Sequence, residues 1–177
     1  MKHTANMFCY QCQETAGCKG CTVSGVCGKQ PDVAAMQDLL IYVTKGLSAA
    51  ATQLREENSS VPAETSRMIL TNLFTTITNA NFDKEAIISR IHETLDRKEE
   101  LLSSVKNQDS LPEAAFWNGK EETFEEKASS VGVLSTENED IRSLRELITY
   151  GLKGLAAYAK HAAALGKEDP EINAFLE

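Results

Sequence analysis

The most regular pattern in the sequence is an apolar stripe that recurs every three or four residues after position 30. It contains eight side chains: Val33, Met36, Leu39, Leu40, Val43, Leu47, Ala50 and Leu54. This spacing places them on one face of an α-helix that runs to about Glu57. Pro31 suits the first helical position, where its missing amide hydrogen is not needed. The polar residues and proline of Asn58–Pro62 then end the pattern.

Two shorter stretches show the same periodicity. We expect a second helix from Ala63 to about Asn79 and a third that starts after Asp83 and reaches about Val105. Asp83 is of the residue type that caps a helix, because its carboxylate accepts a hydrogen bond from a free amide of the first turn. Short connections between three amphipathic helices predict an antiparallel three-helix bundle over residues 31–105.

The periodicity weakens over the connecting segment 106–135, where only one short acidic helix near Glu121–Ser129 is indicated. Thr136 and Glu139 have the spacing of a capping box, so we expect a long helix to begin there. It should end just before Gly166, because glycine readily adopts the left-handed conformation that follows many helices.

An internal repeat links the first and the last long helix. Residues 37–49 match residues 145–157 at an offset of 108 positions. The shared positions pair Tyr42 with Tyr150, Lys45 with Lys153, and Gly46 with Gly154. Glycine inside a helix is unfavourable, so the shared Lys-Gly-Leu favours duplication over a chance match between two amphipathic helices. The repeat therefore predicts two related bundles.

The second of these bundles is expected to be incomplete. The range Asn58–Val105 supplies 48 residues after the first long helix, whereas only 11 residues follow Gly166. We therefore expect an all-α fold of two related three-helix bundles, 31–105 and 136–177, preceded by a cysteine-rich loop over residues 1–30. The same comparison predicts that the chain is a fragment of a longer protein, and that an uncovered apolar face allows it to self-associate.

Charge and composition argue against several classes of partner. The 177 residues carry a net charge of −8, so no basic surface for nucleic acid or an anionic membrane is expected. No apolar run reaches the roughly 18 residues of a membrane span. The first residues also lack the apolar stretch of a secretory signal. We therefore expect a cytoplasmic protein without nucleic-acid or membrane partners.

All five cysteines of the chain lie between Cys9 and Cys27. An odd number of cysteines, in a chain without an export signal, argues against a disulfide framework and for metal binding. Residues 1–29 carry a net charge of +2, from three lysines and one glutamate, while the remainder carries −10. Local positive charge suits thiolates around a metal centre, which carries net negative charge. Four glycines and no apolar periodicity in this stretch indicate a loop that a bound metal organises.

The spacing Cys9-x2-Cys12-x8-Cys21-x5-Cys27 supplies four thiolates to one centre, and Cys18 lies inside the long gap. A CxxC turn aims two thiolates the same way, and two further cysteines on a glycine-rich loop complete the set. Four thiolates suit either tetrahedral zinc or a cubane iron–sulfur cluster, and ligand type alone does not separate the two. The residues favour iron–sulfur over zinc, with redox thiols or disulfides third.

Longer stretches carry a resemblance to a known family. The run MFCYQCQETAGCKGCTVSGVCGKQPDVAAMQDLLIYVTKGLS (7–48) resembles the amino terminus of the hybrid cluster proteins, also called hydroxylamine reductases or prismane proteins. Residues 73–83 and 131–169 resemble the same family, and the match is weakest over 84–130. The similarity thus extends over nearly the whole chain.

The resemblance implies a ligand set. In this family the four cysteines of the motif hold a [4Fe–4S] cluster, which assigns that role here to Cys9, Cys12, Cys21 and Cys27. A family variant with longer gaps between the later cysteines, associated with [2Fe–2S], fits this spacing less well. Cys18 has no partner in the motif and is expected to be a bystander thiol.

The resemblance also implies an electron-transfer role. Members of the family reduce hydroxylamine to ammonia and water with two electrons, and nitric oxide reduction and protein S-nitrosylation, reactions of nitrosative stress, are also attributed to them. This chemistry occurs at a second, iron–sulfur–oxygen hybrid cluster in carboxy-terminal domains, and no cysteine follows Cys27 to supply its ligands. We therefore expect a segment that is inactive alone and that passes electrons from a redox donor protein to those domains. The alternative is a non-enzymatic, zinc-stapled helical interaction module.

Overall fold

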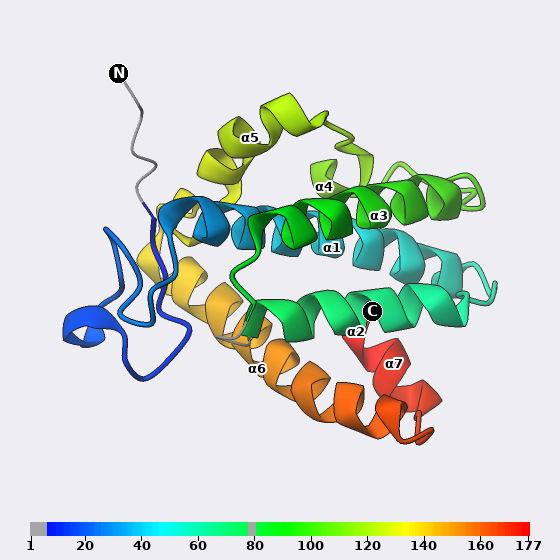
Figure 1. The fold of residues 1–177 in the computed structure, drawn as a ribbon. Coiled ribbons are helices and arrows are strands. Elements are labelled where there is room, and N and C mark those ends of the chain that lie inside the picture. The colour runs from blue at the N-terminus through cyan, green and yellow to red at the C-terminus, as the bar shows by residue number, and fades with distance from the viewer. Residues whose placement is uncertain (1–6, 78–80) are drawn as a thin grey trace.

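The computed structural model of this chain describes residues 7–77 and 81–177, and all regular elements in these ranges are helices (Figure 1). In chain order they are η1 (Ala16–Cys18), α1 (Pro31–Glu56), α2 (Ala63–Ile77), α3 (Lys84–Leu102), α4 (Glu113–Phe116), η2 (Glu121–Thr123), α5 (Phe124–Val131), η3 (Val133–Ser135), α6 (Glu139–Ala164) and α7 (Pro170–Leu176). The predicted all-α class, with a cysteine-rich loop ahead of the first long helix, is confirmed.

Most helix ends follow from the local sequence as expected. Pro31 is the first residue of α1. The Asp83 carboxylate accepts a hydrogen bond from the Ala86 amide at 3.1 Å and so caps α3. The second helix is described as far as Ile77, and its expected end at Asn79 lies outside the described residues.

The long helix α6 ends as expected but begins later than the sequence suggested. Gly166 follows it with a φ of +68°. At its start, Asn138 is the cap, because its side chain accepts a hydrogen bond from the backbone amide of the third helical residue at 3.0 Å. The predicted capping box of Thr136 and Glu139 is therefore wrong. The Thr136 hydroxyl accepts a hydrogen bond from the Arg145 guanidinium at 3.2 Å, and this contact occupies the group that would have capped the helix.

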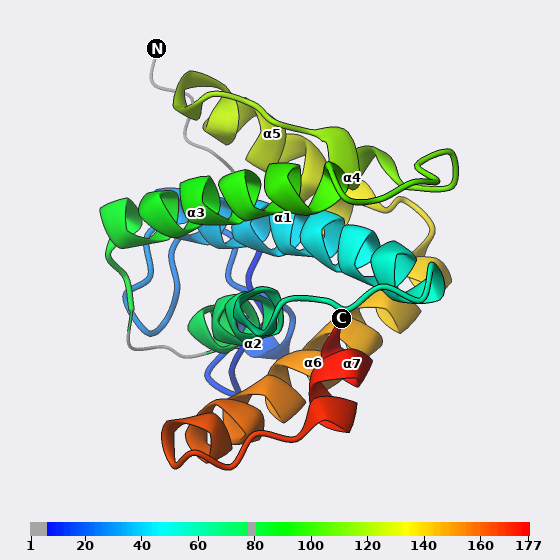
Figure 2. The same cartoon turned by 90° about the vertical axis from the view of Figure 1, so that its right-hand side faces the viewer.

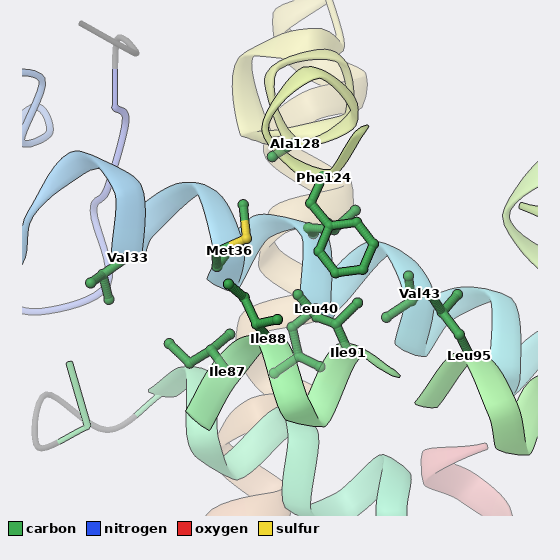
Figure 3. Packing of buried hydrophobic residues seen from close by; sticks show 11 residues of the cluster. Val33, Met36, Leu40, Val43, Ile87, Ile88, Ile91, Leu95, Phe124 and Ala128 are labelled. Carbon is green, nitrogen blue, oxygen red and sulfur yellow. The ribbon is translucent and has the colours of Figure 1, made fainter. Parts of the chain in front are cut away.

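Helix α1 is the central element of the fold. α2 runs antiparallel to it and α3 runs parallel to it, while α4 and α5 pack on a further side (Figures 1 and 2). Eleven buried residues of α1, α3 and α5 form a first core (Figure 3): Val33, Met36, Leu39, Leu40, Val43, Ile87, Ile88, Ile91, Leu95, Phe124 and Ala128. The segment 106–135 therefore supplies part of this core as well as a connection.

A second core is formed by α1, α2, α6 and α7 together with the carboxy-terminal end of α3. Its buried members are Leu47, Ala50, Ala51, Leu54, Ile69, Leu70, Leu73, Leu101, Val105, Ala156 and Leu176. Helix α2 packs against both α1 and α6, so apolar contact continues between the two predicted bundles. The proposed boundaries between them stay a prediction.

The α4 turn approaches α1 closely at Gly46. A Cβ atom at this position would lie 2.1 Å from the carbonyl oxygen of Ala114, so only glycine fits. Lys98 of α3, which is buried, donates hydrogen bonds to the carbonyl oxygens of Ala114, at 2.9 Å, and of Trp117. Burial lowers the pKa of Lys98 to about 8. In the repeated position of α6, by contrast, no described atom lies within 4 Å of a Cβ built at Gly154.

Helix α6 leaves an apolar face uncovered by the described residues. Only Thr149 and Ala156 of its 26 residues are buried. The large apolar side chains exposed along it are Ile141, Leu144, Leu147, Ile148, Tyr150 and Tyr158. None of the helices within 7–77 and 81–177 combines the length and the apolar character of a membrane span.

Candidate metal centre

A two-residue backbone bridge closes the cysteine-rich loop. The Cys9 amide donates to the Cys21 carbonyl oxygen at 3.0 Å, and the Cys21 amide donates to the Cys9 carbonyl oxygen at 2.8 Å. Reciprocal bonding of this kind holds two Cα atoms roughly 5.5 Å apart. The bridge therefore brings together two predicted ligands that lie 12 positions apart in the sequence.

Apolar packing fixes this bridge on α1. Met7 and Cys21 are 5% and 4% exposed, and both pack against Ala34 of α1. Gly20, just before the bridge, has a φ of +143°, and a Cβ atom there would lie 2.5 Å from the ring of Phe8. The turn into the bridge thus requires glycine both for its backbone conformation and for its closeness to the ring.

The remaining thiols lie further out on the same loop. Cys12 is partly buried, and its carbonyl oxygen accepts hydrogen bonds from the amide and the hydroxyl of Thr15 at 3.1 and 2.6 Å, which closes a tight turn. Cys18, in η1, and Cys27 are exposed, and all five thiols are free. In the described part of the chain, no three cysteine, histidine or acidic side chains converge into a ready metal site.

The donor set nevertheless fits a four-thiolate centre in its chemistry. Free thiols occupy a single loop, and the bridge already pairs Cys9 with Cys21. Completing a set of four requires Cys12 and Cys27 to turn toward that pair. The assignment of these four ligands stays a prediction, as does the bystander role of Cys18.

Helix α6 forms hydrogen bonds with the two residues that lie between the first two cysteines. The Tyr10 hydroxyl donates to Glu146 at 2.7 Å, and burial together with this hydrogen bond raises the pKa of Tyr10. The Gln11 carbonyl oxygen accepts a hydrogen bond from the Tyr150 hydroxyl at 3.2 Å, and its side-chain oxygen accepts one from Lys153 at 2.9 Å. Both intervening residues of the CxxC turn are therefore tied to a helix more than 130 positions away.

A buried lysine lies beside the bridge on the α1 side. Lys29 is 1% exposed, and its Nζ lies 3.7 Å from the Cys9 sulfur and 2.7 Å from Oε1 of Gln37. The carbonyl oxygen of Lys29 accepts the amide of Gly25 at 2.8 Å. Both the backbone and the side chain of this lysine are thus held in place.

A small cavity of about 40 Å³ lies among the loop, α1 and α6, and Cys9, Asp38 and Lys153 are among the residues that line it. Burial raises the pKa of the Asp38 carboxyl to about 7, and the nearby Lys153 ammonium offsets part of that rise. Burial also lowers the pKa of Lys153 to about 8, with Asp38 opposing. A larger pocket of about 410 Å³ lies between α1, α6 and α7 and contains none of the cysteines.

Sequence reasoning did not identify the polar groups around the loop. Gln37, Asp38 and Glu146 occupy positions in amphipathic helices that resemble ordinary solvent-facing positions. The one available signal was the repeated Lys-Gly-Leu, which contains Lys153. Its counterpart Lys45 is exposed on α1, so the repeat marked the residue without indicating its contact with the loop.

Comparison with known proteins confirms the resemblance seen in the sequence. Residues 7–177 match the profile of the Prismane/CO dehydrogenase family. The chain is 53% identical over 172 residues to a hydroxylamine reductase of Desulfovibrio desulfuricans, and 56% identical over 178 residues to one of Clostridium perfringens. It is 53% identical over 172 residues to a hydroxylamine reductase of Bacteroides fragilis.

These alignments cover nearly all of this chain but only a part of each relative. Each covers 97% of this chain, but only 32%, 32% and 31% of the respective relatives. The chain thus spans about a third of the length of the curated relatives that it matches.

Proposed function

The chain belongs to the Prismane/CO dehydrogenase family, and on this premise we propose that it is the electron-transfer segment of a hydroxylamine reductase. In this proposal Cys9, Cys12, Cys21 and Cys27 hold a [4Fe–4S] cluster, which when bound supplies one-electron transfer. The observation that carries the proposal is a set of free thiols on one loop, two of them paired by a backbone bridge and one of them beside a buried lysine. Thiolates are the usual ligands of such clusters.

One part of the loop is buried against α1, and another part is exposed to solvent. Met7 and Ala34 pack around the buried thiol of Cys21 and exclude water on the α1 side. Cys27 is exposed, so its part of the loop is open to solvent. In the proposal, a redox donor protein delivers electrons to this exposed part, and a cytoplasmic location supplies the reducing surroundings that free thiols need.

We assign turnover itself to the parts of the relatives that this chain does not match. What supports this assignment is that the resemblance implies a reacting cluster with a cysteine-containing ligand set in carboxy-terminal domains, whereas no cysteine follows Cys27 here. The chain alone is therefore expected to reduce neither hydroxylamine nor nitric oxide with a reduced dye. Clear turnover by the chain alone contradicts this part of the proposal.

Anaerobic reconstitution with iron and sulfide tests the cluster directly. We expect a brown protein with broad visible absorbance and about four irons per chain. Cys12→Ser should abolish the colour, whereas Cys18→Ser, the matched control, should leave it unchanged. One zinc per chain and no colour would favour the zinc-stapled module, and uptake of neither iron nor sulfide would overturn the proposal.

A further inference from the structure

Lys29 is a buried cation whose close neighbours carry no negative charge. It is 1% exposed, and its ammonium contacts the side-chain oxygen of Gln37 at 2.7 Å and lies 5.9 Å from the centre of the Phe82 ring. None of the ion pairs formed within the described residues involves Lys29. Its charge is felt by Asp38, but not at ion-pair distance.

Such an environment is unfavourable for an ammonium group on its own. Removing a charge from water is costly unless an opposite charge or a full set of hydrogen bonds compensates for it. Gln37 supplies one acceptor, and the next atom within reach is the sulfur of Cys9 at 3.7 Å. A thiolate that holds an iron–sulfur centre would supply the missing negative charge at that point.

We propose that Lys29 is a positioning residue of the iron–sulfur site, which donates a hydrogen bond to the Cys9 sulfur and raises the reduction potential of the cluster. The inference rests on the function proposed above. A positive charge and hydrogen bonds to ligand sulfur favour the more negative, reduced form of a cluster. Low dielectric strengthens this effect, because Lys29 is screened from water.

The surrounding contacts keep the lysine at a fixed place. Gln37 belongs to α1, so its side-chain oxygen holds the ammonium against a rigid helix. The hydrogen bond from the Gly25 amide to the Lys29 carbonyl oxygen, at 2.8 Å, fixes the backbone on the loop side. Lys19 lies on the same loop and is exposed, so it offers a control that removes an equal charge without removing a buried contact.

The test uses the 177-residue chain, reconstituted anaerobically, and compares wild type with Lys29→Met, Lys29→Gln, Lys29→Arg and Lys19→Met. Iron and sulfide content report loading, and a redox titration followed by electron paramagnetic resonance reports the midpoint potential. We expect Lys29→Met and Lys29→Gln to load and to titrate at a more negative potential than wild type. Lys29→Arg keeps the charge and should shift less, and Lys19→Met should titrate with wild type.

Each outcome separates this inference from the function on which it rests. A wild-type chain that takes up no iron and sulfide defeats the proposed function itself. If Lys29→Met and Lys29→Gln take up iron and sulfide and titrate at the wild-type midpoint potential, the proposed role of Lys29 is overturned. The proposed cluster is not affected by that result. If those two variants do not load, loading of Lys29→Arg supports a requirement for charge at this position. Failure of all three Lys29 variants beside a loaded Lys19→Met assigns the lysine a structural role only and overturns the inference.

Discussion

Helices α1 and α6 have the same length and share a repeated sequence, yet they occupy opposite environments. Each contains 26 residues, of which 13 are buried in α1 and two in α6. Leu39 is 0% exposed, whereas its counterpart Leu147 is 70% exposed. Leu40 and Ile148 differ in the same way, at 0% and 64%.

The polar residues of the repeat show a matching difference. Tyr42 packs edge-on against Trp117 within the fold around α1. Its counterpart Tyr150 donates a hydrogen bond to the cysteine-rich loop, as does Lys153. The repeated sequence therefore specifies a helix with an apolar stripe. Which residues that stripe and its polar flank contact depends on the neighbouring segments.

The largest predicted loss of stability comes from one of two identical substitutions at repeated leucines. Leu39→Ala should lower the free energy of unfolding by about 3 kcal/mol, because it leaves a cavity in the first core. Leu147→Ala should change it by less than about 0.5 kcal/mol, as expected for an exposed side chain. Urea denaturation of both variants measures this. Equal losses would show that Leu147 is covered in solution, and dilution would then reveal whether a second copy covers it.

The second prediction concerns Lys98, which supports the α4 turn over α1 and has no described equivalent beside α6. In the unfolded chain this lysine keeps its proton up to about pH 10.5, whereas in the folded protein its pKa is about 8. Because the unfolded state binds more protons between these values, the free energy of unfolding should rise with pH by roughly 2 to 3 kcal/mol across that window.

Two variants isolate this effect from other titrations. Lys98→Met should lack the rise, and the exposed Lys120→Met should follow wild type. Urea denaturation at a series of pH values between neutral and alkaline measures the slope. Parallel curves for wild type and Lys98→Met would contradict the depressed pKa.

A smaller loss of stability is expected at the repeated glycines. Gly46→Ala should destabilise the fold by about 2 kcal/mol, because the new methyl group overlaps the Ala114 carbonyl. Gly154→Ala meets open space and should stabilise α6 by up to about 1 kcal/mol through helix propensity. Thermal unfolding followed by circular dichroism compares them. Similar losses for both would mean that a segment packs against α6 at Gly154 as α4 does at Gly46.

The smallest effect should appear at the contact between the loop and α6. Tyr10→Phe removes the hydrogen bond to Glu146 and should cost about 1 kcal/mol. Amide hydrogen exchange should show the loss as faster exchange within the cysteine-rich loop. Tyr158→Phe alters an exposed tyrosine of the same helix and should leave loop exchange unchanged.

Local sequence predicted the helices well because their signals lie within a few residues. All eight stripe residues of α1 are buried, and Asp83 caps α3 as expected. The choice between Thr136 and Asn138 as the α6 cap was not predictable, because both residue types suit that position and a tertiary contact with Arg145 occupies Thr136. Phe124 was likewise placed in a connecting segment, although it is 1% exposed in the first core.

The thiols of the candidate site could be identified from their spacing, but their support could not. Cys9, Cys12, Cys21 and Cys27 stand out in the sequence because they are close together and the chain has no cysteine outside residues 9–27. The residues that hold the loop come from α1 and from α6, and no local pattern marks such distant partners. Lys29 was visible only as part of a net positive charge, and its contact with Gln37 depends on how the loop folds back onto α1.

The hydrogen bonds between α6 and the CxxC turn join segments that the ribosome makes at very different times. Gln11 and Lys153 are 142 positions apart, and a ribosome needs roughly 7 to 30 seconds to add that many residues. The thiols therefore emerge well before the helix that steadies them has been made. A metal delivered after translation encounters a loop that both α1 and α6 hold in place. A metal delivered earlier encounters thiols on a nascent chain in which α6 does not yet contact the loop.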